Sequence, residues 1–90
     1  MKVLKIGAVW CPNCIVMRPR WEKIEKDFPN IETEYLDYDE HEDMLKEKYQ
    51  IGDSLPVFIY LDKNGLELER QIGAVTSKEI CQLLDRFKGL

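Results

Sequence analysis

Two cysteines stand close together near the start of the chain, in the stretch VWCPNC that runs from Val9 to Cys14. Such a pair can bind a soft metal ion, form a structural disulfide, or act as a dithiol that exchanges with other disulfides. The cysteines are separated only by Pro12 and Asn13. The elements that surround the pair decide between these chemistries.

The segments on either side of the pair predict a strand followed at once by a helix. Val3 to Val9 is nearly continuous apolar sequence with β-branched residues, which is typical of a central strand covered on both faces. A helix is predicted from Pro12 to about Phe28, with Pro12 in its first turn and a kink at Pro19. Its inner face carries apolar residues at helical spacing, namely Met17, Trp21, Ile24 and Phe28.

A cysteine between a strand and a helix lies at the helix N-terminus, where unpaired amides and the macrodipole favour an anion. Because Pro12 has no amide proton, the donors available to the Cys11 sulfur are the amides of Asn13 and Cys14 and the Cys14 thiol. We therefore expect Cys11 to be ionised near neutral pH and to act as the nucleophile. Cys14 lies one turn into the helix, and we expect it to be more covered and to act as the resolving thiol.

The rest of the chain predicts five further elements in an α/β arrangement. The first two are a strand over Ile31 to Tyr38 and a short helix over Glu42 to Tyr49, with Met44, Leu45 and Tyr49 facing inward. A strand over Leu55 to Leu61 follows, and a tight turn at Asp62 to Gly65 leads to its partner strand over Leu66 to Ile72. The last element is a helix capped by Thr76 or Ser77, with Ile80, Leu83, Leu84 and Phe87 on its inner face. The order β-α-β-α-β-β-α predicts one mixed four-stranded sheet with helices on both faces, in a single domain of residues 1–90.

Composition excludes several classes of function. Seventeen acidic residues against thirteen basic ones give a net charge of -4, which disfavours binding to nucleic acid. The apolar run at the N-terminus is short and interrupted by Lys5, so it predicts neither a signal peptide nor a membrane segment. We expect a cytoplasmic protein without a membrane partner. Three cysteines in a reducing compartment disfavour a structural disulfide.

Several stretches of the sequence, in the right order, resemble the thioredoxin family. They are WCPNC, the proline five residues after the second cysteine, SLPVFIYLDKNG and RQIGAVTSKEI, and together they cover nearly the whole chain. The resemblance implies a minimal thioredoxin-like fold and a thiol-disulfide oxidoreductase in which Cys11 attacks and Cys14 resolves.

The same resemblance implies a substrate groove beside the dithiol. Pro56 corresponds to the cis-proline of the family, and the backbone of Leu55 would pair with an extended substrate by strand addition. Gly73 would line the same groove. Trp10 abuts Cys11 and is expected to shield its sulfur. With Pro12 and Asn13, these residues make up the predicted substrate-binding site.

Three features depart from the family pattern. The chain starts directly at the active-site strand, and its dipeptide is Pro-Asn instead of Gly-Pro, which leaves the preferred direction of electron flow open. Lys5 stands where thioredoxins usually have a buried aspartate, and Tyr35 stands at the place of a lysine. One hypothesis is that the charge of Lys5 raises the thiolate fraction. The alternative is that its stem is buried and its amine reaches solvent.

The sequence therefore predicts an enzyme that reduces protein disulfides through Cys11 and Cys14, with no cofactor beyond this dithiol. We expect a monomer whose partners are disulfide-containing proteins and an electron donor, either a reductase or glutathione. A carrier of Cu(I) or zinc is one alternative, but a closed zinc site needs four ligands and only His41 and Cys81 remain, so we expect no metal. The second alternative is a binding module that keeps the fold and binds partners without catalysis. We interpret Cys81 as a packing residue and His41 as a surface residue.

Overall fold

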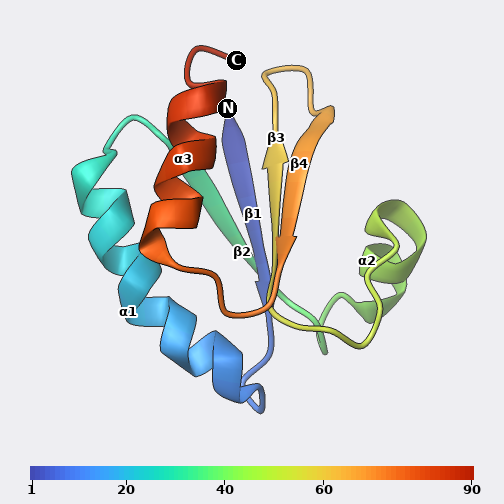
Figure 1. The fold of residues 1–90 in the computed structure, drawn as a ribbon. Coiled ribbons are helices and arrows are strands. Elements are labelled where there is room, and N and C mark those ends of the chain that lie inside the picture. Colours follow the sequence, from blue (N-terminus) through green and yellow to red (C-terminus); the bar gives the residue numbers. More distant parts are fainter.

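The structure, a computed structural model, describes all of residues 1–90 and contains a four-stranded sheet with three helices (Figure 1). In chain order the elements are β1 (Lys2–Gly7), α1 (Pro12–Asp27), β2 (Glu32–Asp37), α2 (Glu42–Tyr49), β3 (Val57–Leu61), β4 (Glu67–Ile72) and α3 (Ser77–Phe87). The strands lie side by side in the order β2-β1-β3-β4. β1 is parallel to β2 and antiparallel to β3, and β3 is antiparallel to β4. The predicted element order and mixed sheet are confirmed.

Helices cover both faces of the sheet, with α1 and α3 on one side and α2 on the other (Figure 1). Because side chains alternate along a strand, β3 contributes Phe58 and Tyr60 to the α1/α3 face and Val57, Ile59 and Leu61 to the opposite face. The α1/α3 face is completed by Val3, Met17, Trp21, Ile24, Ile80, Leu83 and Leu84. Both faces of the central strands are therefore buried, as the sequence indicates.

α1 continues through Pro19 as one helix, as predicted, and the kink expected there stays a prediction. Its inner face buries Met17, Trp21 and Ile24, while Phe28 lies just beyond the last turn and is half-buried. No helix of the structure combines the length and the apolar character needed to cross a membrane.

Two expectations about apolar residues are wrong. β1 ends at Gly7 rather than Val9, and Val9 is 71% exposed, because the chain leaves the sheet before it reaches the dithiol. Met44 is 37% exposed instead of facing inward. α2 has only eight residues, and of its three predicted inward positions only Leu45 is buried completely, with Tyr49 partly covered.

Thr76, and not Ser77, caps α3. The Glu79 amide donates to the Thr76 hydroxyl oxygen at 3.1 Å, and the Thr76 hydroxyl donates to the Glu79 carboxylate at 3.1 Å. The first bond satisfies an amide that the helix itself leaves without a partner, and the second joins the two side chains. Ser77 is the first residue inside the helix.

We predict that Thr76→Ala lowers the free energy of unfolding by about 1 kcal/mol, since the capping bond is lost. Urea denaturation followed by circular dichroism measures the change. Ser77→Ala is the matched control and should leave the unfolding midpoint close to that of the parent. Equal losses in the two variants would contradict the assignment of the cap.

Candidate active site

The dithiol lies where β1 leads into α1. Cys11 is the N-cap of α1, with extended backbone angles of φ −89 and ψ 115, and Pro12 is the first residue of the helix. The Cys14 amide donates to the Cys11 sulfur at 3.3 Å. An amide aimed at the sulfur from the first turn of a helix favours the thiolate over the thiol. Both cysteines are free thiols in the structure.

The prediction that Cys14 is more covered than Cys11 is wrong. Cys11 is 4% exposed and Cys14 is 9% exposed. The reason is a cavity of about 180 Å³ beside Cys14, between α1 and the sheet, which no local sequence pattern indicates. Both sulfurs are nevertheless largely buried.

Cys14 has a weakly acidic thiol. Burial is the main cause that raises its pKa, to about 12, and the neighbouring Cys11 sulfur adds to the effect. A bond to the Ala8 backbone and the charge of Arg18 oppose it. Cys14 is therefore protonated at neutral pH, whereas the helix start favours negative charge on Cys11.

The structure brings Leu55, Pro56 and Gly73 to the same end of the sheet as the dithiol. The Leu55–Pro56 peptide bond is cis, and the Gly73 amide donates to the Pro56 carbonyl at 2.8 Å. Pro56 lines the cavity that Cys14 also lines. Gly73 has a φ of 93, which an L side chain rarely adopts, and a Cβ there would meet no atom within 4 Å. Its backbone conformation, not crowding within the protein, requires the glycine.

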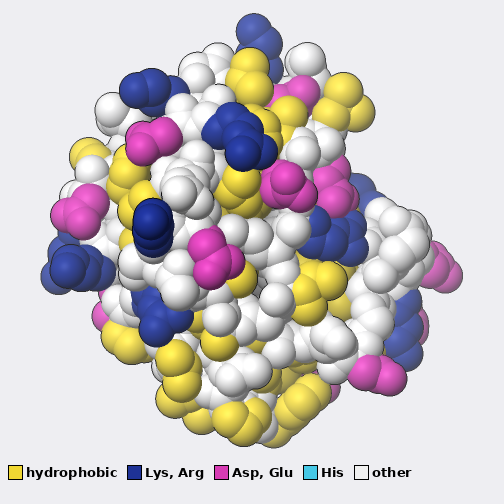
Figure 2. Space-filling view, in the orientation of Figure 1, with side chains coloured by type: hydrophobic (Ala, Val, Ile, Leu, Met, Phe, Trp, Pro, Cys, Tyr) yellow, Lys and Arg dark blue, Asp and Glu magenta, His cyan; other side chains and the backbone are white.

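An exposed apolar rim surrounds the dithiol. Figure 2 shows hydrophobic side chains gathered at the end of the molecule where β1 leads into α1. The exposed large hydrophobic residues of this end are Val9, Trp10, Ile15, Val16 and Ile72. Exposed apolar patches of this kind commonly contact partners. Asn13, within the first turn of α1, is also exposed.

The Trp10 side chain is tied to the loop after β2. Its indole N–H donates to the Asp39 carboxylate at 2.9 Å, and its ring lines a cavity of about 220 Å³ together with Tyr38 and Leu55. Trp10 therefore connects the cysteine loop to the segment that precedes Pro56. Its predicted shielding of the thiolate stays a prediction.

Lys5 points into the space between β1 and α1, where Glu25 binds it. The Lys5 ammonium lies 3.0 Å from the Glu25 carboxylate and 5.8 Å from the centre of the Trp21 ring. The Glu25 carboxylate also accepts a hydrogen bond from the Thr33 hydroxyl. Burial alone would raise the pKa of Glu25, but the bonds from Thr33 and Lys5 outweigh it and hold that pKa below its ordinary value. The role of Lys5 in tuning the dithiol stays a prediction, and Glu25 opposes its charge.

Sequence reasoning missed Glu25 and Arg18. Glu25 follows Trp21 by four residues on the helix and adjoins the buried Ile24, so the predicted inner face carried a signal for it. Arg18 follows Cys14 by the same spacing. Both residues line the cavity beside Cys14.

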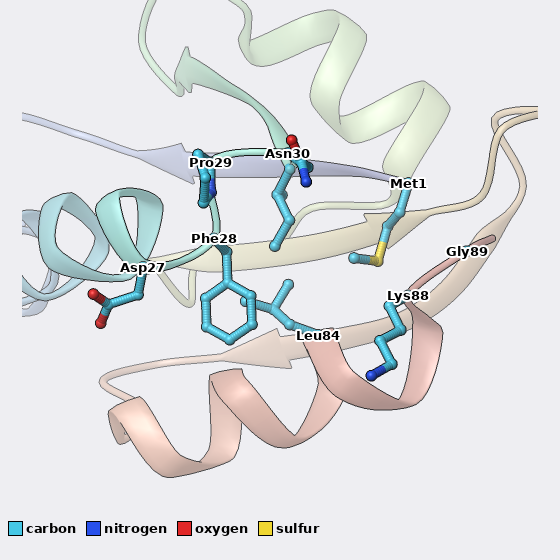
Figure 3. A pocket seen from close by; sticks show the side chains of 9 residues that line it. Met1, Asp27, Phe28, Pro29, Asn30, Leu84, Lys88 and Gly89 are labelled. Carbon is cyan, nitrogen blue, oxygen red and sulfur yellow. The ribbon is translucent and has the colours of Figure 1, made fainter.

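The remaining candidates lie away from the dithiol. Cys81 packs against the core under α1 and α3, and His41 is an exposed residue at the start of α2. No group of three or more histidine, cysteine and carboxylate side chains is placed to hold a metal ion. A cavity of about 310 Å³ at the opposite end of the molecule, into which Met1, Phe28 and Leu84 point (Figure 3), contains no cysteine or histidine.

Comparison with known proteins agrees with this geometry. A family model described as Thioredoxin matches residues 1–84. A thioredoxin of Mycoplasma genitalium is 28% identical over 83 residues, which cover 92% of this chain and 78% of that protein. The chain belongs to the thioredoxin family. It is a thioredoxin-like thiol-disulfide oxidoreductase.

Solved structures show the same fold. The thioredoxin of Fasciola hepatica has a TM-score of 0.85 at 29% identity, over 97% of this chain and 80% of that one. Thioredoxin-2 of a malaria parasite has a TM-score of 0.86 at 29% identity, over 94% of this chain and 81% of that one. A structure from a study of thiol resolution in a yeast mitochondrial 1-Cys peroxiredoxin has a TM-score of 0.81 at 26% identity, over 96% of this chain and 77% of that one.

We predict that iodoacetamide at neutral pH labels Cys11 at least about tenfold faster than Cys14, because only the thiolate reacts. Peptide mass spectrometry distinguishes the two sites. In Cys11→Ser, labelling of Cys14 should remain slow. This result would show that Cys14 does not react slowly merely because an already alkylated Cys11 blocks access to it. Equal labelling rates in the parent would contradict the assignment.

We also predict an acid-sensitive contribution of Glu25 to stability. The pKa of Glu25 is lower in the folded than in the unfolded chain. Its contribution to stability is therefore complete at pH values above about 4.5 and is lost as the pH falls through the pKa of the folded state. At neutral pH, Glu25→Gln should lower the free energy of unfolding by about 0.5–1 kcal/mol. Urea denaturation across a pH series measures how this difference shrinks in acid.

The exposed Glu47 provides the control for this measurement. Glu47→Gln should change the free energy of unfolding little at any pH, because the Glu47 carboxylate is solvated. A Glu25→Gln difference that stays constant into strong acid would rule out the charged pair as its origin.

Proposed function

We propose that this chain reduces protein disulfides through Cys11 and Cys14. The single observation that carries the proposal is the 3.3 Å bond from the Cys14 amide to the Cys11 sulfur at the start of α1. That bond and the helix dipole favour a thiolate, which is the nucleophile of thiol-disulfide exchange.

The proposed reaction has two exchange steps. The Cys11 thiolate attacks one sulfur of the substrate disulfide, forms a mixed disulfide, and releases the other substrate sulfur, which takes up a proton. Cys14 then loses its proton and attacks the Cys11 sulfur, which breaks the mixed disulfide and releases the second substrate thiol. The Cys11–Cys14 pair is oxidised and the substrate disulfide is reduced.

The surface around Cys11 supports an extended polypeptide as the substrate. The Leu55 backbone precedes β3 without belonging to it, and Gly73 presents no side chain next to Pro56. An extended segment can add to such a backbone edge, while the exposed Trp10 and Ile72 contact its side chains. The neighbour from the peroxiredoxin study, which concerns resolution through glutathione and thioredoxin systems, supports protein thiols as partners.

The proposal needs no bound cofactor, since the dithiol itself carries the electrons. Regeneration then requires an electron donor in the cytoplasm, either a reductase or glutathione. The carrier alternative has less support, because small copper chaperones follow the order β-α-β-β-α-β and this chain follows β-α-β-α-β-β-α.

Insulin reduction in the presence of dithiothreitol tests the proposal. The parent should accelerate precipitation of the insulin B chain, and Cys11→Ser should fall to the rate of dithiothreitol alone, because no nucleophile remains. Cys81→Ala is the matched control and should keep the parent rate. If the parent and Cys11→Ser gave equal rates, the chain would instead be a binding module without catalysis.

A further inference from the structure

The cavity beside Cys14 brings together polar groups from three elements. Cys14 and Arg18 come from α1, Lys5 from β1 and Tyr35 from β2. These positions are far apart in the sequence, but β1 and β2 are paired so that Lys5 lies opposite Tyr35. A polar cavity of about 180 Å³ is large enough to hold water.

Gly7 allows the Tyr35 hydroxyl and the Cys14 sulfur to approach each other. A Cβ at Gly7 would stand 3.1 Å from the Cys14 sulfur and 3.4 Å from the Tyr35 hydroxyl oxygen. Gly7 is not among the residues with positive φ, so space and not backbone conformation explains the glycine. The hydroxyl and the resolving sulfur therefore both face the volume that a side chain at this position would fill.

Two of the carboxylates near Cys14, those of Glu25 and Asp37, already accept hydrogen bonds. Glu25 accepts bonds from Lys5 and Thr33, and Asp37 accepts the backbone amides of Asp39 and Glu40 at 2.9 Å and 3.3 Å. The Glu22 side chain, on the exposed side of α1, also borders the cavity. Hydrogen bonds lower the pKa of Glu25, which makes its carboxylate a poor acceptor for the proton of a buried thiol.

We propose that the Tyr35 hydroxyl, assisted by the charge of Arg18, stabilises the Cys14 thiolate when the mixed disulfide is resolved. The inference rests on the proposed function and concerns its second step. Cys14 gives its proton to water in the cavity, not to a protein carboxylate. Its sulfur then forms a bond to the Cys11 sulfur, and the bond from Cys11 to the substrate breaks. The departing substrate thiolate takes a proton from solvent, so protons and electrons balance.

The state of the phenol suits this role. Burial is the main cause that raises the pKa of Tyr35, and the charges of Asp37 and Cys14 act in the same direction. The phenol is therefore protonated at neutral pH and can donate a hydrogen bond. Tyr35 is also 49% exposed, so water reaches its ring.

Stopped-flow reaction of the reduced protein with 5,5′-dithiobis(2-nitrobenzoate) tests the inference. Attack by Cys11 releases one nitrothiobenzoate in a first phase, and resolution by Cys14 releases another in a second phase. Tyr35→Phe should slow the second phase about tenfold, the effect of one hydrogen bond to a charged group, and leave the first phase nearly unchanged. Arg18→Met should slow the second phase about threefold.

The pH profile and two controls separate this role from a packing role. The rate of the second phase should rise steadily with pH, without a plateau near neutrality that would indicate a protein base. Tyr49→Phe, on the half-buried tyrosine of α2, should leave both phases unchanged. Glu25→Gln should not slow the second phase, because Glu25 is not the proton acceptor.

Three outcomes would overturn the inference. They are an unchanged second phase in Tyr35→Phe, equal slowing of both phases in that variant, and a slower second phase in Glu25→Gln. Failure of the proposed function looks different, because the first phase of the parent itself would then be no faster than that of a free thiol.

Discussion

The active end of the molecule depends on how β1 passes into α1. β1 pairs on both sides, with β2 and β3, so its end is fixed by the sheet. The Cys11 amide donates to the Ala8 carbonyl at 3.2 Å, and the Ile15 amide donates to the Cys11 carbonyl at 3.3 Å. These two backbone bonds end the turn and begin the helix at the same residue. The position of Cys11 is thus determined by the backbone before any side chain contributes.

From this point the two sulfurs acquire opposite properties, although only two residues separate them. Cys11 occupies the cap, where a backbone amide is directed at its sulfur. Cys14 lies inside the first turn, where burial disfavours a negative charge on its sulfur. The amide of Cys14 donates its hydrogen bond to the Cys11 sulfur. Two thiols whose surroundings differ in this way can react in a defined order. This difference between the two sulfurs arises at the helix start.

Sequence patterns predict the parts of this structure that depend on neighbours along the chain. The helix start at Pro12 and the cap near Thr76 follow from local spacing. The exposure of Met44 does not, because it depends on how an eight-residue helix rests on its face of the sheet. The relative coverage of Cys11 and Cys14 does not either, because it depends on a cavity whose walls come from α1 and three strands.

The cluster around Lys5 illustrates why a substituted residue cannot be interpreted alone. A lysine that points between a strand and a helix requires a countercharge, and α1 supplies it with Glu25, which Thr33 of β2 also binds. Because opposite charges at 3.0 Å partly cancel at a distance, Glu25 weakens the effect that the charge of Lys5 alone would have on the dithiol. None of the ion pairs of the structure involves Arg18, and its charge lowers the pKa of Cys14. The cationic side chain that lowers the pKa of Cys14 is Arg18, one turn further along α1.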